Sequence, residues 1–288
     1  MTNPTTIRRR AARTAVVAVL VVLTGCGQQV PDTVALTPAD RSAVNTCAHA
    51  AAVVQRALDT VAGAKNGAMR PAAAGARLTK VSRSLQAAAE SAADDVVQQA
   101  VQDLVDSVTA YLAVLPDRTI GAYADAEADV TGRLAGFRRT CPVANAGFDV
   151  GAEGWTATSG TSELTSADTG QSGSRGLDLT NVGNKPSAIG VTDSPNWVDR
   201  TWRGTYRAGL WARTQVGTPT LTLVVHEKSA GAVVGEARAS VRIGPEWTFV
   251  GVSYDATGRG GPLDIRVSVD QVPATVAVHV DGFAVARG

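Results

Sequence analysis

The chain changes its hydrophobic pattern once, at Cys141, and this change limits what it can fold into. From Thr37 to Cys141 about a quarter of the residues are alanine and none is tryptophan. All five tryptophans and 21 of the 29 glycines follow Cys141. Alanine favours helix and glycine opposes it, whereas turn-rich segments with aromatic residues favour sheet. We therefore expect a helical domain over residues 37–141 and a β-domain over residues 142–288.

Four apolar stripes with alternating spacings of three and four predict an antiparallel bundle of four helices in the first domain. Thr37 and Pro38 supply a capping hydroxyl and a proline at the first helical position. The stripes are Val44, Cys47, Ala51, Val54, Leu58 and Val61; Leu78, Val81, Leu85, Ala88 and Ala92; Val97, Val101, Leu104, Val108, Tyr111 and Leu115; and Ile120, Tyr123, Val130, Leu134 and Phe137. Three helices are the alternative, if the second and third stripes belong to one helix.

The period is two from Asn145 onward. Residues 220–225, 264–270 and 276–281 alternate between two faces, which is typical of half-buried antiparallel strands. Turn signals such as SPN, SAG and GRGGP separate them. About eight to ten strands in roughly 145 residues is the size of a β-sandwich.

The first 25 residues predict export. Four arginines and no acidic residue precede a short apolar run, Ala15–Leu23. Nine residues rise only about 13 Å as a helix, well short of the roughly 20 residues that cross a bilayer. A basic start, a short apolar run and small residues before a cleavage point describe a secretory signal peptide.

The segment that ends this run, Leu23-Thr24-Gly25-Cys26, resembles the lipobox of bacterial lipoproteins. The resemblance implies that Cys26 receives a diacylglycerol, that cleavage follows Gly25 and that the new amino terminus is acylated. Residues 26–36 would then be a lipid-anchored linker. Three acyl chains, at about 0.8 kcal/mol per buried CH₂, would hold the protein on the outer face of the bacterial cytoplasmic membrane. The alternative is an ordinary secreted protein in which Cys26 has no role.

The charge balance argues against nucleic acid as a partner. Loss of the four arginines before Cys26 changes the formal charge from +1 to −3. Binding to phosphate backbones needs clustered cations, which a mildly acidic chain does not offer.

The two remaining cysteines, Cys47 and Cys141, are expected to form a disulfide. Exported compartments are usually oxidising. Cys47 belongs to the first apolar stripe, and Cys141 follows Phe137 by four residues and extends the last one. In an up-down bundle the start of the first helix and the end of the fourth share one pole, so both sulfurs should meet in the core. Two buried free thiols are the alternative.

Four segments of the second domain carry a resemblance to a family. They are NAGFDVGAEGWTATSG (145–160), YRAGLWART (206–214), EWTFVGVSY (246–254) and VAVHVDGFAV (276–285). In this order they resemble the jelly-roll carbohydrate-binding modules of families 4, 9 and 22, which have the galactose-binding-like fold. The resemblance spans the whole β-domain and implies a non-catalytic domain that binds a polysaccharide or cell-wall glycan.

The same resemblance assigns Trp155, Trp211 and Trp247 to the space between the sheets. Trp197 and Trp202 differ, because they lie in a polar loop, SPNWVDRTWRG, together with Asp199, Arg200 and Arg203. Sugars stack their CH faces on aromatic rings and need hydrogen-bonding groups nearby. We therefore expect Trp197, Trp202, Arg203 and His226 to bind carbohydrate, with Trp197 as a plug at one end of the sandwich as the alternative. Polar residues of alternating strands could line a groove or form an ordinary solvated face: Thr222, His226, Arg266, Asp270 and His279.

A structural calcium ion is a second implication of the resemblance. Similar modules hold calcium between an acidic residue after the first strand and an aspartate of the last strand, and Asp149 and Asp281 occupy these places. Family members usually have glutamate where Asp149 stands, and calcium needs six to eight oxygens. Two solvated carboxylates are the alternative. No cofactor is expected to be required.

No catalytic pattern is present in the sequence. It contains no Gly-x-Ser-x-Gly elbow, no His-Glu-x-x-His motif and no phosphate-binding glycine loop. We therefore expect a non-catalytic glycan-binding lipoprotein. A lipoprotein whose jelly roll binds a protein partner is the alternative, and a glycoside hydrolase accessory or unrecognised hydrolase is a lesser one.

Overall fold

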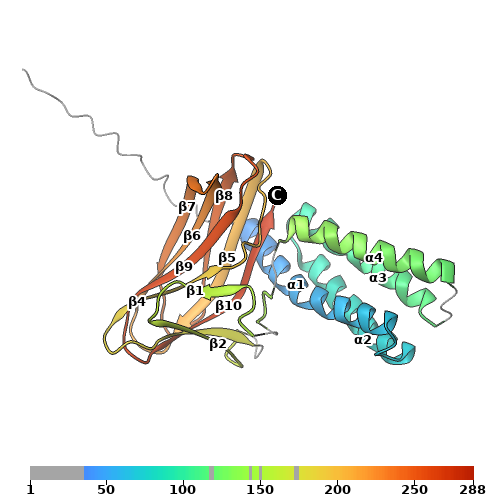
Figure 1. Ribbon diagram of the computed structural model, residues 1–288, viewed down its shortest axis with the longest axis horizontal. Helices are drawn as coiled ribbons and strands as arrows, with labels where there is room; N and C mark the ends of the chain where they lie inside the picture. The colour runs from blue at the N-terminus through green and yellow to red at the C-terminus, as the bar shows by residue number, and fades with distance from the viewer. Residues whose placement is uncertain (1–35, 117–119, 143–144, 149–150, 172–174) are drawn as a thin grey trace, which may run out of the picture. The chain divides into compact units, whose positions relative to one another are not determined.

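The structure, a computed structural model, describes residues 36–116, 120–142, 145–148, 151–171 and 175–288. The predicted lipidation site Cys26 and the predicted calcium ligand Asp149 lie outside these residues. Within them, four helices are followed by ten strands in two antiparallel five-stranded sheets (Figure 1). The predicted fold class is confirmed, and the alternative of three helices is wrong.

The helices are α1 (Pro38–Lys65), α2 (Pro71–Ser91), α3 (Asp95–Val114) and α4 (Ile120–Thr140). The strands are β1 (Trp155–Ala157), β2 (Ser162–Ala167), β3 (Gly176–Asn181), β4 (Ser187–Asp193), β5 (Gly204–Thr214), β6 (Thr220–Ser229), β7 (Ala232–Arg242), β8 (Thr248–Ala256), β9 (Leu263–Val272) and β10 (Ala277–Arg287).

Helix α1 begins at the predicted cap. The Thr37 hydroxyl accepts the backbone N–H of Asp40, and the Asp40 carboxylate accepts the backbone N–H of Thr37. This reciprocal capping box satisfies two N–H groups that a helix start leaves without partners. Helix α2 packs against α1 and α3, and α4 packs against α3. The predicted stripes supply most of the buried side chains of this bundle. None of the described helices combines the length and hydropathy needed to cross a bilayer.

A disulfide joins Cys47 of α1 to Cys141, the residue after α4, as predicted. Their Cα atoms are 5.3 Å apart across a sequence separation of 94 residues, and both side chains are fully buried. The disulfide ties the end of the last helix to the first.

The strands form a β-sandwich. The first sheet has the order β1-β4-β9-β6-β7 and the second sheet the order β2-β3-β10-β5-β8. Strands that follow one another in sequence often lie in different sheets, which is the connectivity of a jelly roll. The predicted alternation is confirmed in β9, where Ile265, Val267 and Val269 are fully buried while Arg266 and Asp270 are exposed.

Helix α1 covers part of the outer face of the second sheet, where it contacts β10 and β5. Close approach is possible because Gly209 lacks a side chain: a Cβ there would lie 3.1 Å from Cγ1 of Val44. Trp211 Nε1 donates to Asn45 Oδ1 at 3.1 Å. Arg207 pairs with Asp94 at 3.1 Å and also with Asp40. Within the described part of the chain, no helix packs on the first sheet in this way.

Two predictions about tryptophan are wrong, and the helical layer explains one of them, Trp211. Trp155 is buried between the sheets, as expected. Trp211 instead faces α1 beside Phe249, with ring centroids 5.3 Å apart. Trp247 lies half-buried under the Arg213 guanidinium, 4.7 Å from its ring centroid. Both rings therefore lie on the outer side of the second sheet, where other side chains cover them, and not between the sheets.

Candidate functional site

The loop between β4 and β5, residues 194–203, presents one exposed aromatic ring. Trp202 is 52% exposed, and the Arg200 guanidinium lies 4.9 Å from its ring centroid. Trp197 is half-buried instead. Its ring packs edge-on against Trp155 at 4.4 Å and against Phe283 at 5.2 Å. Trp197 therefore plugs the end of the sandwich, which was the alternative reading of the sequence, and Trp202 is the ring available to a ligand.

The first half of this loop is fixed to the first sheet. The backbone N–H of Trp197 donates to the Asp193 carboxylate at 2.9 Å. Val198 forms an isolated antiparallel bridge with Leu263 and accepts its N–H at 2.9 Å. The plugging ring is thus held by its backbone as well as by its packing.

The second half of the loop is fixed by Thr201 and Trp202. The Thr201 N–H donates to the Gly261 carbonyl at 2.7 Å, and its hydroxyl donates to Glu227 at 2.9 Å. The Trp202 N–H donates to the Tyr206 hydroxyl at 3.0 Å. The exposed ring therefore projects from a backbone with few degrees of freedom, and binding a ligand costs little ordering entropy.

Glu227 is the buried anchor of this region. Its side chain is fully buried and accepts hydrogen bonds from the Thr201 hydroxyl, the Tyr254 hydroxyl, and both the N–H and the hydroxyl of Thr257. Burial alone raises the pKa of a carboxyl group, but these four donors outweigh it and lower the pKa of Glu227 to about 2. Sequence reasoning missed this residue. The sequence signal for its burial was the alternation along β6, which puts Glu227 on the same inward face as Leu223 and Val225.

Asp193 shows the opposite shift. Its carboxylate accepts N–H groups from Ile265 at 2.8 Å and Trp197 at 2.9 Å, and the Asn196 amide at 3.3 Å. Burial outweighs these bonds and, with a small contribution from the negative charge of Asp264, raises the pKa of Asp193 to about 6.

This shift predicts a pH dependence of stability. The folded-state pKa of Asp193 exceeds the unfolded value of 3.8, so the folded state favours the protonated carboxyl. The stabilisation by this group is therefore complete below pH 4 and is lost as the pH rises through 6. We expect Asp193→Asn to remove a decrease of about 2–3 kcal/mol in the free energy of unfolding between pH 4 and 7. Urea unfolding of both proteins across this range measures it. Parallel pH profiles for the two proteins would contradict the assignment.

A shallow hollow of about 100 Å³ lies beside Trp202, between the loop and the end of α4. Arg138, Arg139 and Arg200 line it, with Asp199 as the carboxylate among the lining residues. Typical enclosed ligand pockets measure about 300–1,000 Å³. The site is therefore an open aromatic platform with an excess of guanidinium groups.

A polar cluster lies on the outer face of the first sheet, next to the point where Val198 meets β9. Asp264 is its centre and pairs with Lys228 at 2.7 Å and Arg266 at 2.8 Å. Burial raises the pKa of Asp264, but the bonds from these cations and from the Thr192 hydroxyl outweigh it, so the pKa lies below its ordinary value. His226 Nε2 bonds Glu236 at 2.9 Å.

The structure does not bring all the predicted residues together. Arg203 is exposed beside Trp202, whereas His226 belongs to the polar cluster, and no hydrogen bond or ion pair between described residues joins His226 to the loop. The five polar residues that could line a groove do not share one surface. His279 lies on the second sheet, where it bonds Asp178 at 2.7 Å, while the other four residues lie on the first sheet. Strands of both sheets show the same alternation of polar and apolar residues, so the sequence does not indicate to which sheet a strand belongs.

Asp281 is buried in β10 and lines a cavity of about 360 Å³. Its carboxylate accepts backbone N–H groups from Gln171 at 2.8 Å and Gly282 at 2.6 Å. Among the described residues, no group of three or more His, Cys, Asp or Glu side chains is arranged to hold a metal.

Comparison with family models finds no match, and comparison with curated proteins finds none either. Solved structures are similar to about half of this chain. One is an arabinose-bound α-L-arabinofuranosidase, at 17% identity over 51% of this chain, with a TM-score of 0.42. Another holds a family 22 module and a family 10 glycoside hydrolase module of Clostridium thermocellum xylanase 10B with xylohexaose, at 21% identity over 51% of this chain and a TM-score of 0.41.

This chain spans only 26% and 29% of the lengths of those two proteins. A family 61 carbohydrate-binding module in complex with β-1,4-galactotriose is covered over 99% of its length, with 18% identity over 51% of this chain and a TM-score of 0.41. With these identities and TM-scores, none of the three likenesses assigns a ligand or a residue role to this chain.

Proposed function

We propose that this protein is a non-catalytic binder of carbohydrate that uses the Trp202 platform. The observation that carries the proposal is an indole 52% exposed on a loop that is hydrogen-bonded to the sandwich at both ends. An exposed indole offers an aromatic face on which the CH groups of a sugar ring can stack. Rigid support is what stacking on a sugar ring needs, since the ring must be presented in one orientation.

The charge around the platform favours an acidic glycan. Arg138, Arg139 and Arg200 line the hollow, Arg203 is exposed nearby, and Asp199 is the lining carboxylate. Guanidinium groups bind carboxylates and phosphates through paired N–H donors. Uronic acid or phosphate-bearing polymers of a cell wall present such groups next to sugar rings.

Affinity electrophoresis against neutral and acidic polysaccharides, including peptidoglycan, tests this function. We expect Trp202→Ala to weaken binding at least about tenfold, because it removes the stacking surface at the centre of the site. Trp202→Phe should retain part of the affinity, since it keeps an aromatic face.

Val182→Ala is a matched control, because Val182 is also an exposed apolar side chain, at 50%, but lies after β3. It should bind like the unmodified protein. Equal migration of all variants in every gel, with no retardation, would refute glycan binding. Retardation by a protein partner that Trp202→Ala abolishes would favour the alternative of a protein-binding jelly roll.

Membrane anchorage through Cys26 is part of the same proposal. It is supported by the signal-like segment and the lipobox resemblance of residues 23–26. The anchor would place the protein on the outer face of the bacterial cytoplasmic membrane. Mass spectrometry of the membrane fraction should find three acyl chains on Cys26; a soluble protein with an unmodified first residue would contradict it.

Calcium binding near Asp281 is a separate proposal. Asp281 would supply one carboxylate, and a bound ion would link β10 to the chain before β1. Millimolar calcium should raise the melting temperature relative to chelator, and Asp281→Asn should abolish the difference. Equal melting temperatures of the unmodified protein in both conditions would exclude a structural ion.

A further inference from the structure

A row of polar side chains crosses the outer face of the second sheet, two residues along β5 from Trp211, where α1 packs. Arg213 of β5 stands directly opposite His279 of β10, and His279 stands directly opposite Asp178 of β3. Side chains of such cross-strand pairs are neighbours on one face of a sheet. Trp211 faces α1, and residues two apart in a strand share a face, so this row points outward. It brings a guanidinium group next to an imidazole.

Asp178 fixes the orientation of the His279 ring. Nδ1 of His279 bonds Asp178 Oδ1 at 2.7 Å, and the Thr169 hydroxyl donates to the same oxygen at 2.7 Å. Burial raises the pKa of Asp178, but these two bonds and the positive charges of His279 and Arg213 outweigh it, so the pKa lies below its ordinary value. Because an ionised carboxylate only accepts hydrogen bonds, Nδ1 carries a proton and Nε2 is the nitrogen left for a ligand. No hydrogen bond between described residues engages Nε2.

Arg213 is held on its other side by Trp247. Its guanidinium lies 4.7 Å from the Trp247 ring centroid, and its Nε is buried without a hydrogen-bond partner. Within the described part of the chain, no carboxylate forms an ion pair with Arg213. A stacked guanidinium keeps its N–H donors at its edge, and a buried N–H without a protein acceptor fits a ligand that supplies one.

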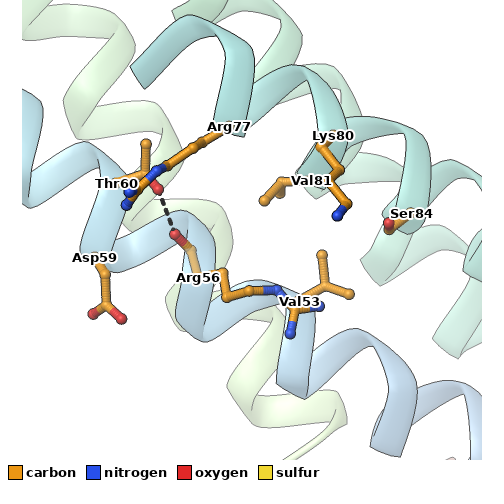
Figure 2. A pocket seen from close by; sticks show the side chains of 8 residues that line it. All are labelled: Val53, Arg56, Asp59, Thr60, Arg77, Lys80, Val81 and Ser84. Atoms are coloured by element: carbon orange, nitrogen blue, oxygen red, sulfur yellow. Dashed lines mark hydrogen bonds between the residues drawn. The ribbon is translucent and has the colours of Figure 1, made fainter. Parts of the chain in front are cut away.

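The cations between α1 and α2 lack this support. Figure 2 shows their groove, of about 510 Å³, with Arg77 and Lys80 projecting from α2. Both side chains are exposed, so a ligand would have to restrict their rotation at a cost in entropy. Arg213 differs because it is half-buried, stacked on an indole and next to an oriented imidazole.

We propose that Arg213 and His279 bind a carboxylate with a hydroxyl group beside it, as found in hydroxy acids and in uronate residues. The carboxylate would accept N–H groups of Arg213, and the hydroxyl would donate to Nε2 of neutral His279. Arg213 is the last residue but one of β5, whereas Trp202 precedes the first residue of that strand. The inference is therefore independent of glycan binding by the Trp202 platform and extends beyond it.

NMR titration of the full chain at fixed pH and ionic strength tests this site through the indole N–H of Trp247 and the ring signals of His279. Lactate represents a free hydroxy acid, and D-galacturonate represents a uronate residue of a glycan. Propionate lacks the hydroxyl, and D-glucose lacks the carboxylate. We expect lactate, galacturonate or both to shift these signals, propionate to bind about fivefold more weakly, and glucose to leave them unchanged.

Two variants separate the roles of the two side chains. Arg213→Gln should weaken binding of the preferred probe at least about tenfold, because it removes a charge-assisted pair of donors. His279→Gln should weaken it about fivefold but leave the affinity for propionate unchanged, because only the hydroxyl loses its partner. A purely structural role of His279 would weaken both probes equally. The dispersion of the amide signals shows in the same spectra that each variant is folded.

Arg41→Gln is the matched control. The Arg41 guanidinium also stacks on an aromatic ring, 4.9 Å from the Phe249 centroid, but Arg41 belongs to α1. It should change the affinity less than about twofold, and so should Trp202→Ala, which separates this site from the platform. Binding of lactate alone, of galacturonate alone or of both, with this pattern of variants, supports the site and identifies the source of its ligand. Failure of both to shift the Trp247 signal, equal affinity for lactate and propionate, or equal weakening by Arg41→Gln overturns it.

Discussion

Glu227→Ala is expected to lower the free energy of unfolding by about 3–5 kcal/mol. The substitution removes a fully buried carboxylate and leaves the hydroxyls of Thr201, Tyr254 and Thr257 and the N–H of Thr257 without their acceptor. Each buried donor without a partner costs about 1–3 kcal/mol, and the costs within one cluster are not additive. Urea unfolding at pH 7 measures the loss.

Two variants separate the buried hydrogen bonds from the charge. Glu227→Gln keeps the shape and one acceptor oxygen, and the Thr201 hydroxyl can accept from its amide, so its loss should be smaller. Glu236→Ala removes a carboxylate from the outer face of the first sheet, where it bonds His226 and is partly exposed. We expect it to cost less than about 1 kcal/mol. Equal losses for Glu227→Ala and Glu236→Ala would show that Glu227 is not an anchor.

The pKa of Glu227 adds a readout in acid. Its folded-state pKa of about 2 lies below the unfolded value of 4.5. Its contribution is therefore complete above pH 4.5 and is lost as the pH falls toward 2. Glu227→Gln should remove this part of the acid sensitivity.

The Glu227 carboxylate also orders Thr201 in the loop that carries Trp202. Glu227→Ala should therefore weaken glycan binding through Trp202. Normal binding by this variant would argue against a preorganised platform.

The sequence predicts the secondary structure of both halves because each half repeats one period. Stripes at spacings of three and four specify helices whether or not their neighbours are known. Strict alternation specifies strands in the same way. The Cys47–Cys141 disulfide was also predictable, since both cysteines extend apolar stripes and therefore point into the bundle.

Contacts between the helices and the sandwich were not predictable from these periods. Trp211 and Phe249 occupy outward positions of their strands and become covered only because α1 packs there. A sequence signal did exist. Gly209 and Gly251 also hold outward positions, and a Cβ at Gly251 would lie only 2.5 Å from Leu36. Glycine inside a strand often marks close approach of another part of the backbone or of another element.

The candidate site was predicted in part. The polarity of the loop around Trp202 indicated an exposed ring, and the structure places it there. Separating Trp197 from Trp202 needed the tertiary contacts of Trp197 with Trp155 and Phe283. The anchors Asp193 and Glu227 were missed because a carboxylate on a strand suggests solvent, and only the three-dimensional structure shows the donors that make its burial favourable.

Removing the disulfide is expected to lower the free energy of unfolding by about 4–5 kcal/mol. The bond between Cys47 and Cys141 closes a loop with a sequence separation of 94 residues, and in the chain-entropy model the gain rises with loop length. Apolar burial in the bundle is too small to compensate for the loss of the disulfide. Many of its buried side chains are alanine, and each alanine removes little apolar area from water.

The double variant Cys47→Ala with Cys141→Ala is the cleanest test, because alanine leaves no polar group in the buried position. It should unfold at a lower urea concentration than the oxidised protein. Reduction of the unmodified protein should reproduce this decrease, and a reducing agent should have no effect on the variant.

The disulfide joins the end of α4 to α1, and α1 in turn packs on the second sheet through Asn45 and Trp211. Loss of the disulfide should therefore also increase amide exchange in α4 more than in the strands of the first sheet. Unchanged stability after reduction would mean that packing alone holds α4 in place.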